Sequence, residues 1–323
     1  MLKKILLFIL LPFSIIVSIA FFIIKDPIIK KVEVSKETIL ADSVQLKKHV
    51  LFLSTIQPAR NFANIQSLDS CANYIKNYWL PFADTVYFQE FEVEGKIYKN
   101  VIASFGTQNK KRLIIGAHYD ACEELPGADD NASGTAGLLE LGKMLHGKNL
   151  NKRIDLVAYT LEEPPFFRTQ NMGSAIHAKS LLSDRNNIMG MICLEMIGYF
   201  SDAEGSQDYP IAALKAVYPK VGNYITVVGK IGGGDLTKEV KKLMMQGSSI
   251  PVESISAPSS LVGIDFSDHL NYWNHNFEAV MISNTGFFRN KNYHTALDTP
   301  EKLNYTKISQ VVSSVYFTAI SLK

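Results

Sequence analysis

Short apolar runs alternate with helix-like segments along most of this chain, and this alternation limits the folds that it can adopt. The clearest strand-like runs are RLIIGAHYD (112–120), RIDLVAYTLEE (153–163), MGMICLEMIGYF (189–200), YITVVGK (224–230) and AVMISNTG (279–286). The helical segments lie at 134–145, 173–182, 236–246, 267–275 and 305–322. Strands that alternate with helices predict a mostly parallel sheet covered on both faces. We therefore expect an α/β fold, a three-layer α/β/α sandwich with a mixed, mostly parallel central sheet.

The rest of the chain fits around this pattern. Residues 86–105 predict a hairpin with its turn at 94–96, and residues 26–85 predict a linker followed by amphipathic helices. The polar stretch 247–260 predicts a loop. Because the sequence contains no internal repeat, low-complexity tract or interior boundary, we expect one catalytic domain over residues 26–323.

A hydrophobic segment precedes this domain. Residues 5–24 contain no charged residue and stop at Lys25. Twenty apolar residues are enough for a helix to cross the hydrocarbon core of a bilayer. A cleaved signal peptide is the alternative, because residues 18–20 resemble a cleavage site, although the apolar run continues past them. Residues 1–25 are thus predicted to be a signal anchor or a signal peptide. Either one predicts an extracytoplasmic protein, periplasmic or at the cell surface, membrane-anchored or secreted.

Composition and charge exclude several classes of protein. The 33 Lys and Arg residues nearly balance the 31 Asp and Glu residues, so we expect no nucleic-acid partner. Apolar residues at 47% and charged residues at 20% are typical of a globular protein and exclude a disordered one. Cys71, Cys122 and Cys193 show no CxxC spacing and cannot all pair, so neither a disulfide framework nor a cysteine-cage zinc site is expected.

Side chains suited to metal binding or proton transfer follow four of the predicted strands. In chain order they are His118 and Asp120, then Glu162 and Glu163, then Glu195, and finally His294. In open α/β sheets the active crevice lies beyond the carboxyl ends of the strands, so we expect these side chains to converge. Imidazole together with carboxylate suits zinc, and a site without cysteine ligands is more typical of catalysis than of a structural cage.

Each of these residues alone has a structural alternative. His118 can be a hydrogen-bonded structural histidine, and either Asp129 or Asp130 can cap the helix that follows. The pair at 162–163 can be a solvated strand end. Glu195 is harder to explain in this way, because it lies in the apolar run MICLEMIGY and an unpaired buried carboxylate is costly. The set as a whole favours a catalytic metal site.

Five motifs then support a more specific interpretation. In order they are HYD (118–120), GADDNASG (127–134), LEE (161–163), LEMIGY (194–199) and YHTALDTPEKL (293–303). Together they resemble the M28 family of co-catalytic di-zinc exopeptidases, and the resemblance covers nearly all of the chain after residue 25. It implies a metallo-exopeptidase, a zinc-dependent aminopeptidase that hydrolyses the N-terminal residue of peptides with a free N-terminus.

The resemblance also implies two Zn²⁺ per chain and a ligand set. Asp130 matches the carboxylate that bridges both ions, and the peptide bond that follows it is expected to be cis. His118 and Glu195 match the other ligands of one zinc, and Glu163 and His294 match those of the second. Many family members carry Asp where this chain has Glu195, whose extra methylene can shift or loosen the metal.

Further roles follow from the same resemblance. Glu162 matches the general base, which takes a proton from the metal-activated water and passes it to the leaving amine. Asp120 matches the carboxylate that orients the His118 ring. The stretch Ser267-Asp268-His269 does not predict a serine triad, because contiguous residues cannot act as nucleophile, base and orienting group. We expect Asp268 beside the metal ligands instead.

Other residues leave alternatives open. The segment 164–168 predicts either a wall of the substrate pocket or plain packing, and Arg289 is either a surface arginine or a cation for a substrate carboxylate. Gly232-Gly233-Gly234 lacks the context of a dinucleotide-binding motif and predicts a flexible loop. Four histidines without a motif are expected to be structural or exposed: His49, His146, His177 and His275.

Three other functions compete with the aminopeptidase. A glutaminyl cyclase-type acyltransferase shares the fold and resembles a single-zinc enzyme, but the motif GADDNASG favours the peptidase. A glutamate carboxypeptidase-like exopeptidase needs a cation for the substrate carboxylate, for which Arg289 is the candidate. A non-enzymatic binding domain is disfavoured, because all five predicted ligand positions carry competent side chains.

Overall fold

The computed structural model describes Lys25, Ile28 and residues 32–36 and 38–323. The predicted anchor at 5–24 therefore lies outside the described residues. Within the part of the chain that is described, no helix combines the length and the hydrophobicity needed to span a membrane. All three cysteines are free, as expected from their spacing.

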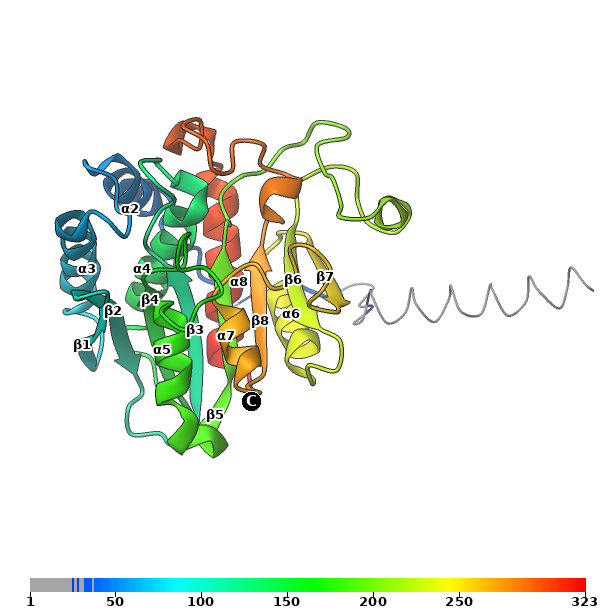
Figure 1. The fold of residues 1–323 in the computed structure, drawn as a ribbon. Helices are drawn as coiled ribbons and strands as arrows, with labels where there is room; N and C mark the ends of the chain where they lie inside the picture. The colour runs from blue at the N-terminus through cyan, green and yellow to red at the C-terminus, as the bar shows by residue number, and fades with distance from the viewer. Residues whose placement is uncertain (1–24, 26–27, 29–31, 37) are drawn as a thin grey trace, which may run out of the picture.

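A mixed sheet forms the middle layer of the molecule (Figure 1). Its strands are β1 (Thr85–Val93), β2 (Lys96–Phe105), β3 (Arg112–His118), β4 (Arg153–Tyr159), β5 (Ile188–Glu195), β6 (Ile225–Lys230), β7 (Val252–Ala257) and β8 (Ala279–Ser283). They lie in the order β1-β2-β4-β3-β5-β8-β6-β7. The neighbours β4, β3, β5 and β8 are parallel to one another, and β6 and β7 also pair in parallel. The pairs β1–β2, β2–β4 and β6–β8 are antiparallel. The predicted α/β fold with a mixed sheet is confirmed.

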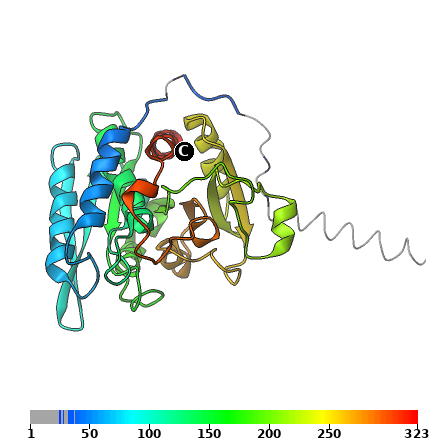
Figure 2. The same ribbon diagram turned by 90° about the horizontal axis from the view of Figure 1, so that it is seen from above.

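Helices cover both faces of the sheet. One face carries α4 (Gly134–Leu145), α6 (Leu236–Gly247), α8 (Tyr305–Ser321) and, over β2, α3 (Ile65–Trp79), with α2 (Ser43–Thr55) packed against α4 and α8. The other face carries α5 (Gly173–Ser180) and α7 (His269–Asn274). Seen from above in Figure 2, α8 and α7 lie on opposite sides of the strands. Short helical turns complete the connections: 128–133, 182–187, 212–216, 286–288 and 300–302.

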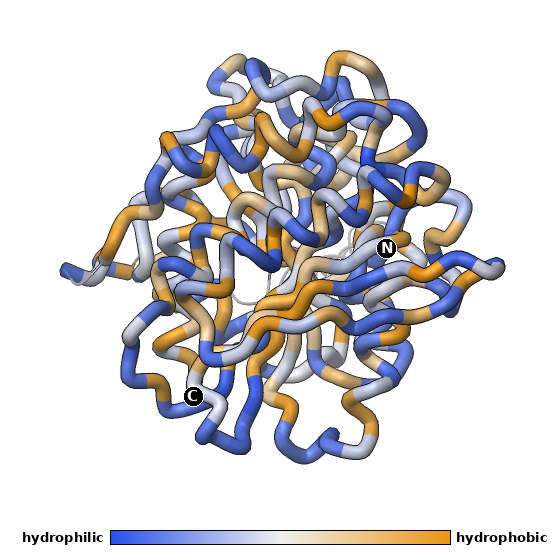
Figure 3. The backbone as a smooth tube through the Cα atoms, turned by 90° about the vertical axis from the view of Figure 1, so that its left-hand side faces the viewer, coloured by the Kyte–Doolittle hydropathy of each residue, from blue (hydrophilic) through white to orange (hydrophobic). Residues whose placement is uncertain are grey.

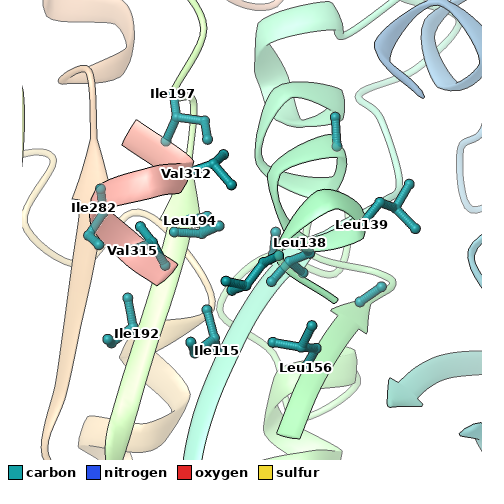
Figure 4. Close-up of a cluster of buried hydrophobic side chains, with 14 of the residues drawn as sticks. Ile115, Leu138, Leu139, Leu156, Ile192, Leu194, Ile197, Ile282, Val312 and Val315 are labelled. Atoms are coloured by element: carbon teal, nitrogen blue, oxygen red, sulfur yellow. The ribbon is translucent and has the colours of Figure 1, made fainter. Parts of the chain in front are cut away.

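Continuous apolar stretches place the central strands in the core. Hydrophobic residues concentrate in strands at the middle of the molecule, whereas the outer segments mix hydrophilic and hydrophobic residues (Figure 3). Figure 4 shows Leu138 of α4 and Val312 and Val315 of α8 packed over Ile115 and Ile192. Strands of a parallel sheet buried on both faces are expected to be apolar throughout, which explains the absence of polar alternation in β3, β4 and β5.

One prediction about the fold is wrong. The polar stretch 247–260, expected to be a loop, contains β7, which pairs in parallel with β6 at the edge of the sheet. Its sequence VESISA places polar residues between apolar ones, so it lacks the continuous hydrophobic run that marks the central strands. An edge strand is stabilised by backbone hydrogen bonds to one neighbour, which its side chains do not reveal.

A fully buried arginine fixes the loop between β3 and α4. The Arg60 side chain is only 1% exposed. Its guanidinium donates hydrogen bonds to four backbone carbonyls, those of Leu53 (3.0 Å), Tyr119 (2.8 Å), Pro126 (2.6 Å) and Gly127 (2.6 Å). Gly127 itself is required here, because its φ is +53° and a Cβ would meet the Asp130 carbonyl oxygen at 2.1 Å. The loop that carries several of the predicted site residues thus depends on Arg60.

Replacing Arg60 with methionine tests this dependence. The substitution Arg60→Met keeps an apolar stem but leaves buried carbonyls without donors, each of which costs about 1–3 kcal/mol. We expect urea unfolding of the purified protein to give a free energy of unfolding lower by roughly 3 kcal/mol or more. The exposed Arg185 supplies the control, since Arg185→Met should change stability by about 0.5 kcal/mol at most. Equal effects of the two substitutions would contradict the assignment.

Candidate metal centre

The parallel strands bring the predicted side chains to one edge of the sheet. His118 is the last residue of β3 and Glu195 the last residue of β5. Each lies two residues beyond the pair Gly116–Cys193, so the two side chains lie level and on the same face. Glu162 follows the end of β4 closely, and the loop after β8 carries His294.

Asp130 reaches this edge from a short helical turn at residues 128–133. Its peptide bond to Asn131 is cis, as the resemblance implies. The Asn131 side chain ties this turn to the end of β5, because its Oδ1 accepts from the Gly134 N–H (3.0 Å) and the Met196 N–H (3.1 Å). A Cβ at Gly134 would lie 2.3 Å from that oxygen, which explains the last glycine of GADDNASG.

Asp130 lies between the two histidines, with one oxygen toward each. Its Oδ1 is 3.3 Å from His118 Nε2 and its Oδ2 is 3.1 Å from His294 Nε2. Glu195 Oε2 lies 3.4 Å from His118 Nε2, and Glu163 Oε2 lies 3.1 Å from His294 Nε2. The five predicted ligands therefore form two groups that share the Asp130 carboxylate.

The other three predicted residues border these groups. Glu162 Oε2 lies 3.8 Å from His118 Nε2. Asp120 Oδ1 lies 3.5 Å from Nδ1 on the far side of the same ring, and its Oδ2 accepts from the Glu163 N–H at 3.1 Å. Asp268 is fully buried at the start of α7, where burial raises its pKa to about 7 and the nearby charge of His118 opposes this rise. All eight predicted site residues thus lie together.

The groups fit metal ions. His118 Nε2, His294 Nε2 and Glu163 Oε1 are buried, yet none has a hydrogen-bond partner among the described residues. A buried polar atom without a partner is costly, and a cation removes that cost. The ligand atoms of His118, Asp130 and Glu195 all lie within 4.8 Å of one another, which is compatible with one shared ion. Imidazole and carboxylate donors are those that zinc uses in catalytic sites.

The protonation equilibria reflect the same excess of negative charge. Burial raises the pKa of Glu162 well above its usual value, and the charges of Glu163 and Glu195 raise it further. Burial raises the pKa of Glu163 to about 7, with Asp130 contributing. Burial alone would lower the pKa of His118, but Glu162 and Glu195 reverse this and raise it well above the usual value. In the absence of metal, protons must supply the missing positive charge.

A second layer of polar residues holds Asp130 in place. Both backbone N–H groups of Asp129 and Asp130 donate to the Asp298 carboxylate at 3.1 Å. The Asp129 carboxylate accepts from the side chains of Asn284 (2.8 Å) and Asn290 (2.9 Å). Asp129 therefore serves neither as a ligand nor as a helix cap. Asp298 was not among the site residues predicted from the sequence, although it lies within the motif YHTALDTPEKL.

Three further residues close to the ligands were not among the site residues predicted from the sequence. Ser267 donates to Glu195 Oε2 at 2.5 Å, and Asn131 donates to the same oxygen at 3.3 Å. These two bonds hold the longer side chain that this chain carries in place of aspartate. Cys122 lies beside Glu163 and His294, and the ligand atoms of these three residues are within 4.8 Å of one another. The position of Cys122 directly after HYDA was the available signal.

The backbone around the site is unusual. Among the described residues, eight non-glycine positions have positive φ, and three of them adjoin or are site residues: Leu161 (φ 60°), Met196 (φ 45°) and His294 (φ 52°). Such conformations cluster at functional sites because the surrounding structure must enforce them. Leu161 and Met196 lie at the ends of β4 and β5, where they turn the chain next to Glu162 and Glu195.

A pocket of about 240 Å³ opens from the carboxylates and descends along the sheet. Ser283 and Thr226 lie opposite each other at the level of Glu195, and Met281 and Val228 lie opposite each other two residues deeper. Two residues of a strand span roughly 7 Å, which is the depth that separates these two pairs. The lining of the pocket is mainly apolar and includes Pro164, Phe167, Leu214, Tyr218, Ile255, Phe266 and Phe287.

The structure decides between the alternatives that the sequence left open for residues 164–168 and for Arg289. Pro164 and Phe167 line the pocket, whereas Phe166 is buried and packs against Phe62. The prediction that Arg289 is a surface arginine is wrong, because this residue is only 2% exposed. Its Nε donates to Gln207 Oε1 (2.8 Å), its Nη1 donates to a backbone carbonyl, and it does not line the pocket. Residues 232–234 follow β6 as a loop, as predicted.

Comparison with known proteins agrees with this fold. The Legionella pneumophila LapA aminopeptidase superimposes with a TM-score of 0.68 at 19% identity, covering 87% of this chain and 72% of LapA. A Bacteroides thetaiotaomicron glutaminyl cyclase superimposes with a TM-score of 0.66 at 19% identity, covering 89% of this chain and 100% of the cyclase. At these identities the two structures support the fold alone.

Sequence comparison identifies the family. The chain is 44% identical over 283 residues to the uncharacterized protein YfbL of Escherichia coli (strain K12), covering 85% of this chain and 87% of YfbL. It spans about half the length (52%) of a probable leucine aminopeptidase of Arthroderma otae, with 23% identity. The family model described as peptidase family M28 matches residues 100–318. The chain therefore belongs to peptidase family M28, which confirms the predicted enzyme class, a metallopeptidase.

Proposed function

We propose that this protein is a zinc-dependent aminopeptidase that binds two Zn²⁺ and removes the N-terminal residue of peptides. The observation that carries the proposal is the Asp130 carboxylate, whose two oxygens face His118 and His294 on opposite sides. A carboxylate in this position can bridge two ions. Two bound zinc ions would supply Lewis acidity to the scissile carbonyl and to an attacking water molecule.

The side chains of the protein divide the remaining tasks. His118 and Glu195 would hold one ion and Glu163 and His294 the other, with Asp130 shared between them. Glu162 borders both groups and lines the pocket, so it can take a proton from the attacking water and deliver it to the leaving amine.

The pocket supports a preference for apolar and aromatic N-terminal residues. An apolar cavity of roughly 150 Å³ is enough to hold benzene, so one of about 240 Å³ accommodates an aromatic side chain. With that side chain in the pocket, the free amine of the substrate lies among the carboxylates of Asp130, Glu163 and Glu195, all of which line the pocket. Cleavage is then limited to the first peptide bond.

Removal of the proposed base should abolish turnover without loss of metal. We expect Glu162→Gln to lower kcat on leucine p-nitroanilide by roughly 10²- to 10⁴-fold, because the amide cannot accept the proton. KM and the zinc content measured by elemental analysis should stay within about threefold of the unmodified protein. As a comparison, Glu163→Gln should also lower the zinc content, since Glu163 is assigned as a ligand. A kcat for Glu162→Gln within threefold of wild type would refute the role of base.

Removal of the metal should destabilise the fold as well as stop catalysis. Without cations the buried carboxylates repel one another, and a ligand present at about 100 to 1,000 times its Kd stabilises by roughly 3–4 kcal/mol. We expect dialysis against a chelator to lower the unfolding temperature by roughly 5 °C or more, and added Zn²⁺ to restore both stability and activity. Calorimetric titration of the metal-free protein should show two equivalents of zinc per chain.

Filling the pocket should change specificity rather than chemistry. Val228 lies in the deep part of the pocket, so Val228→Phe should lower kcat/KM for substrates that begin with Phe or Leu by roughly tenfold or more. Substrates that begin with Ala should be cleaved nearly as before. Ile231 is exposed just beyond β6 and does not line the pocket, so the same substitution at this position provides a matched control. If Val228→Phe slows all substrates equally, the pocket does not bind the first side chain.

A glutaminyl cyclase is the second candidate, because its fold is shared over the full length of the Bacteroides enzyme. The two ligand groups around Asp130 favour the peptidase, whereas a single-zinc transferase needs only one group. The two reactions separate in one experiment with Gln-starting peptides analysed by mass spectrometry. Stepwise loss of the first residue supports the aminopeptidase, and loss of ammonia with an intact chain supports the cyclase. The carboxypeptidase alternative loses its basis, since Arg289 does not line the pocket.

A further inference from the structure

Cys122 lies among the candidate ligands although the sequence pattern excluded cysteine from the metal site. It follows Asp120 by two residues, in the loop whose carbonyls Arg60 holds. The Cys122 Sγ, a Glu163 carboxylate oxygen and a His294 ring nitrogen all lie within 4.8 Å of one another. The thiol is half-buried and not part of a disulfide.

The neighbours of this thiol have unused binding capacity. Glu163 is 5% exposed, and its Oε1 finds no hydrogen-bond partner among the described residues. His294 Nε2 also has no hydrogen-bond partner among the described residues. A second, very small cavity of about 10 Å³ is lined by Cys122, Asp130 and His294. Glu163 does not line this cavity, so the short distances among Cys122 Sγ, Glu163 and His294, rather than the cavity, indicate where an ion would bind.

The two ligand groups differ in this respect. On the other side, Glu195 Oε2 already accepts hydrogen bonds from Ser267 and Asn131, and in the described part of the chain no cysteine groups with His118, Asp130 and Glu195. With Cys122 the second group offers four protein ligands, whereas the first offers three. The geometry therefore predicts two unequal metal positions.

We propose that Cys122 is a fourth protein ligand, with Asp130, Glu163 and His294, of one of the two metal ions. This inference rests on the proposed metal centre. When the ion binds, the S–H bond breaks, the proton leaves to solvent and a metal–sulfur bond forms. A soft thiolate makes this position selective for Zn²⁺, Co²⁺ or Cd²⁺ over the harder Mg²⁺ and Mn²⁺.

A different role for Cys122 makes a different prediction. If the thiol only contacts the His294 side chain and orients it, no metal–sulfur bond exists. Loss of activity in a cysteine variant does not separate these cases, because both disturb His294. The absorption spectrum of cobalt does separate them, since Co²⁺ bound to a thiolate has a sulfur-to-metal charge-transfer band in the near ultraviolet, which nitrogen and oxygen ligands do not produce.

The experiment loads the metal-free, full-length protein with two equivalents of Co²⁺ and records its absorption spectrum. We expect a near-ultraviolet charge-transfer band together with the visible bands of the ion. Cys122→Ser should lose the ultraviolet band and keep visible bands, and competition with a chelator should show that one of its two equivalents binds about tenfold or more weakly. Cys193→Ala removes a different buried thiol, which contacts Ser267 (3.2 Å), and this variant should keep the ultraviolet band. It is therefore the matched control.

Three outcomes would overturn the proposal: bound cobalt without the ultraviolet band, a band that persists in Cys122→Ser, or a band lost in Cys193→Ala. If Cys122→Ser does not fold, the unmodified protein decides alone. Cadmium-113 NMR of that protein should then show one resonance shifted downfield by sulfur and one typical of nitrogen and oxygen ligands. Two resonances without a sulfur shift would reject the cysteine ligand but leave the metal centre intact, whereas failure to bind any metal would reject the centre itself.

Discussion

The parallel pairing of β4, β3, β5 and β8 is the constraint on which the rest of the structure depends. Parallel strands end at the same edge of a sheet, so the residues that follow them meet without a dedicated supporting element. Backbone hydrogen bonds place His118 and Glu195 at the same level. Burial of both faces fixes this register, because a slip of one residue would turn every apolar side chain to the wrong side. The apolar core and the polar site are therefore set by the same pairing.

The site concentrates negative charge that the protein does not neutralise by itself. The two buried arginines near it donate to carbonyl and amide oxygens: Arg60 to backbone carbonyls and Arg289 to Gln207 and Tyr224. Neutral donors such as Asn131, Ser267, Asn284 and Asn290 hold the carboxylates without discharging them. This arrangement keeps the carboxylates available to a cation, and it explains why buried imidazole and carboxylate atoms remain without hydrogen-bond partners.

The pocket and the carboxylates share one face of the sheet, which links specificity to chemistry. Ser283 and Thr226 lie at the level of Glu195, and Met281 and Val228 lie directly below them on the same face. A side chain that enters the pocket therefore brings its own backbone to the proposed ions. The likeness to both an aminopeptidase and a glutaminyl cyclase shows that this fold hosts more than one reaction.

The central strands, the helices between them and the eight candidate residues that cluster beyond the strands were predictable from sequence, because apolar runs, helical periodicity and ordered motifs are local signals. The edge strand β7 was not, since its stability comes from backbone pairing with β6. Nor were Arg60, Ser267, Asp298 and Cys122, whose contacts join residues far apart in the chain. Arg289 looked like a surface residue because nothing in its local sequence reports burial. The sequence by itself determined which side chains are candidates for the chemistry, and only the tertiary structure decided which of them meet.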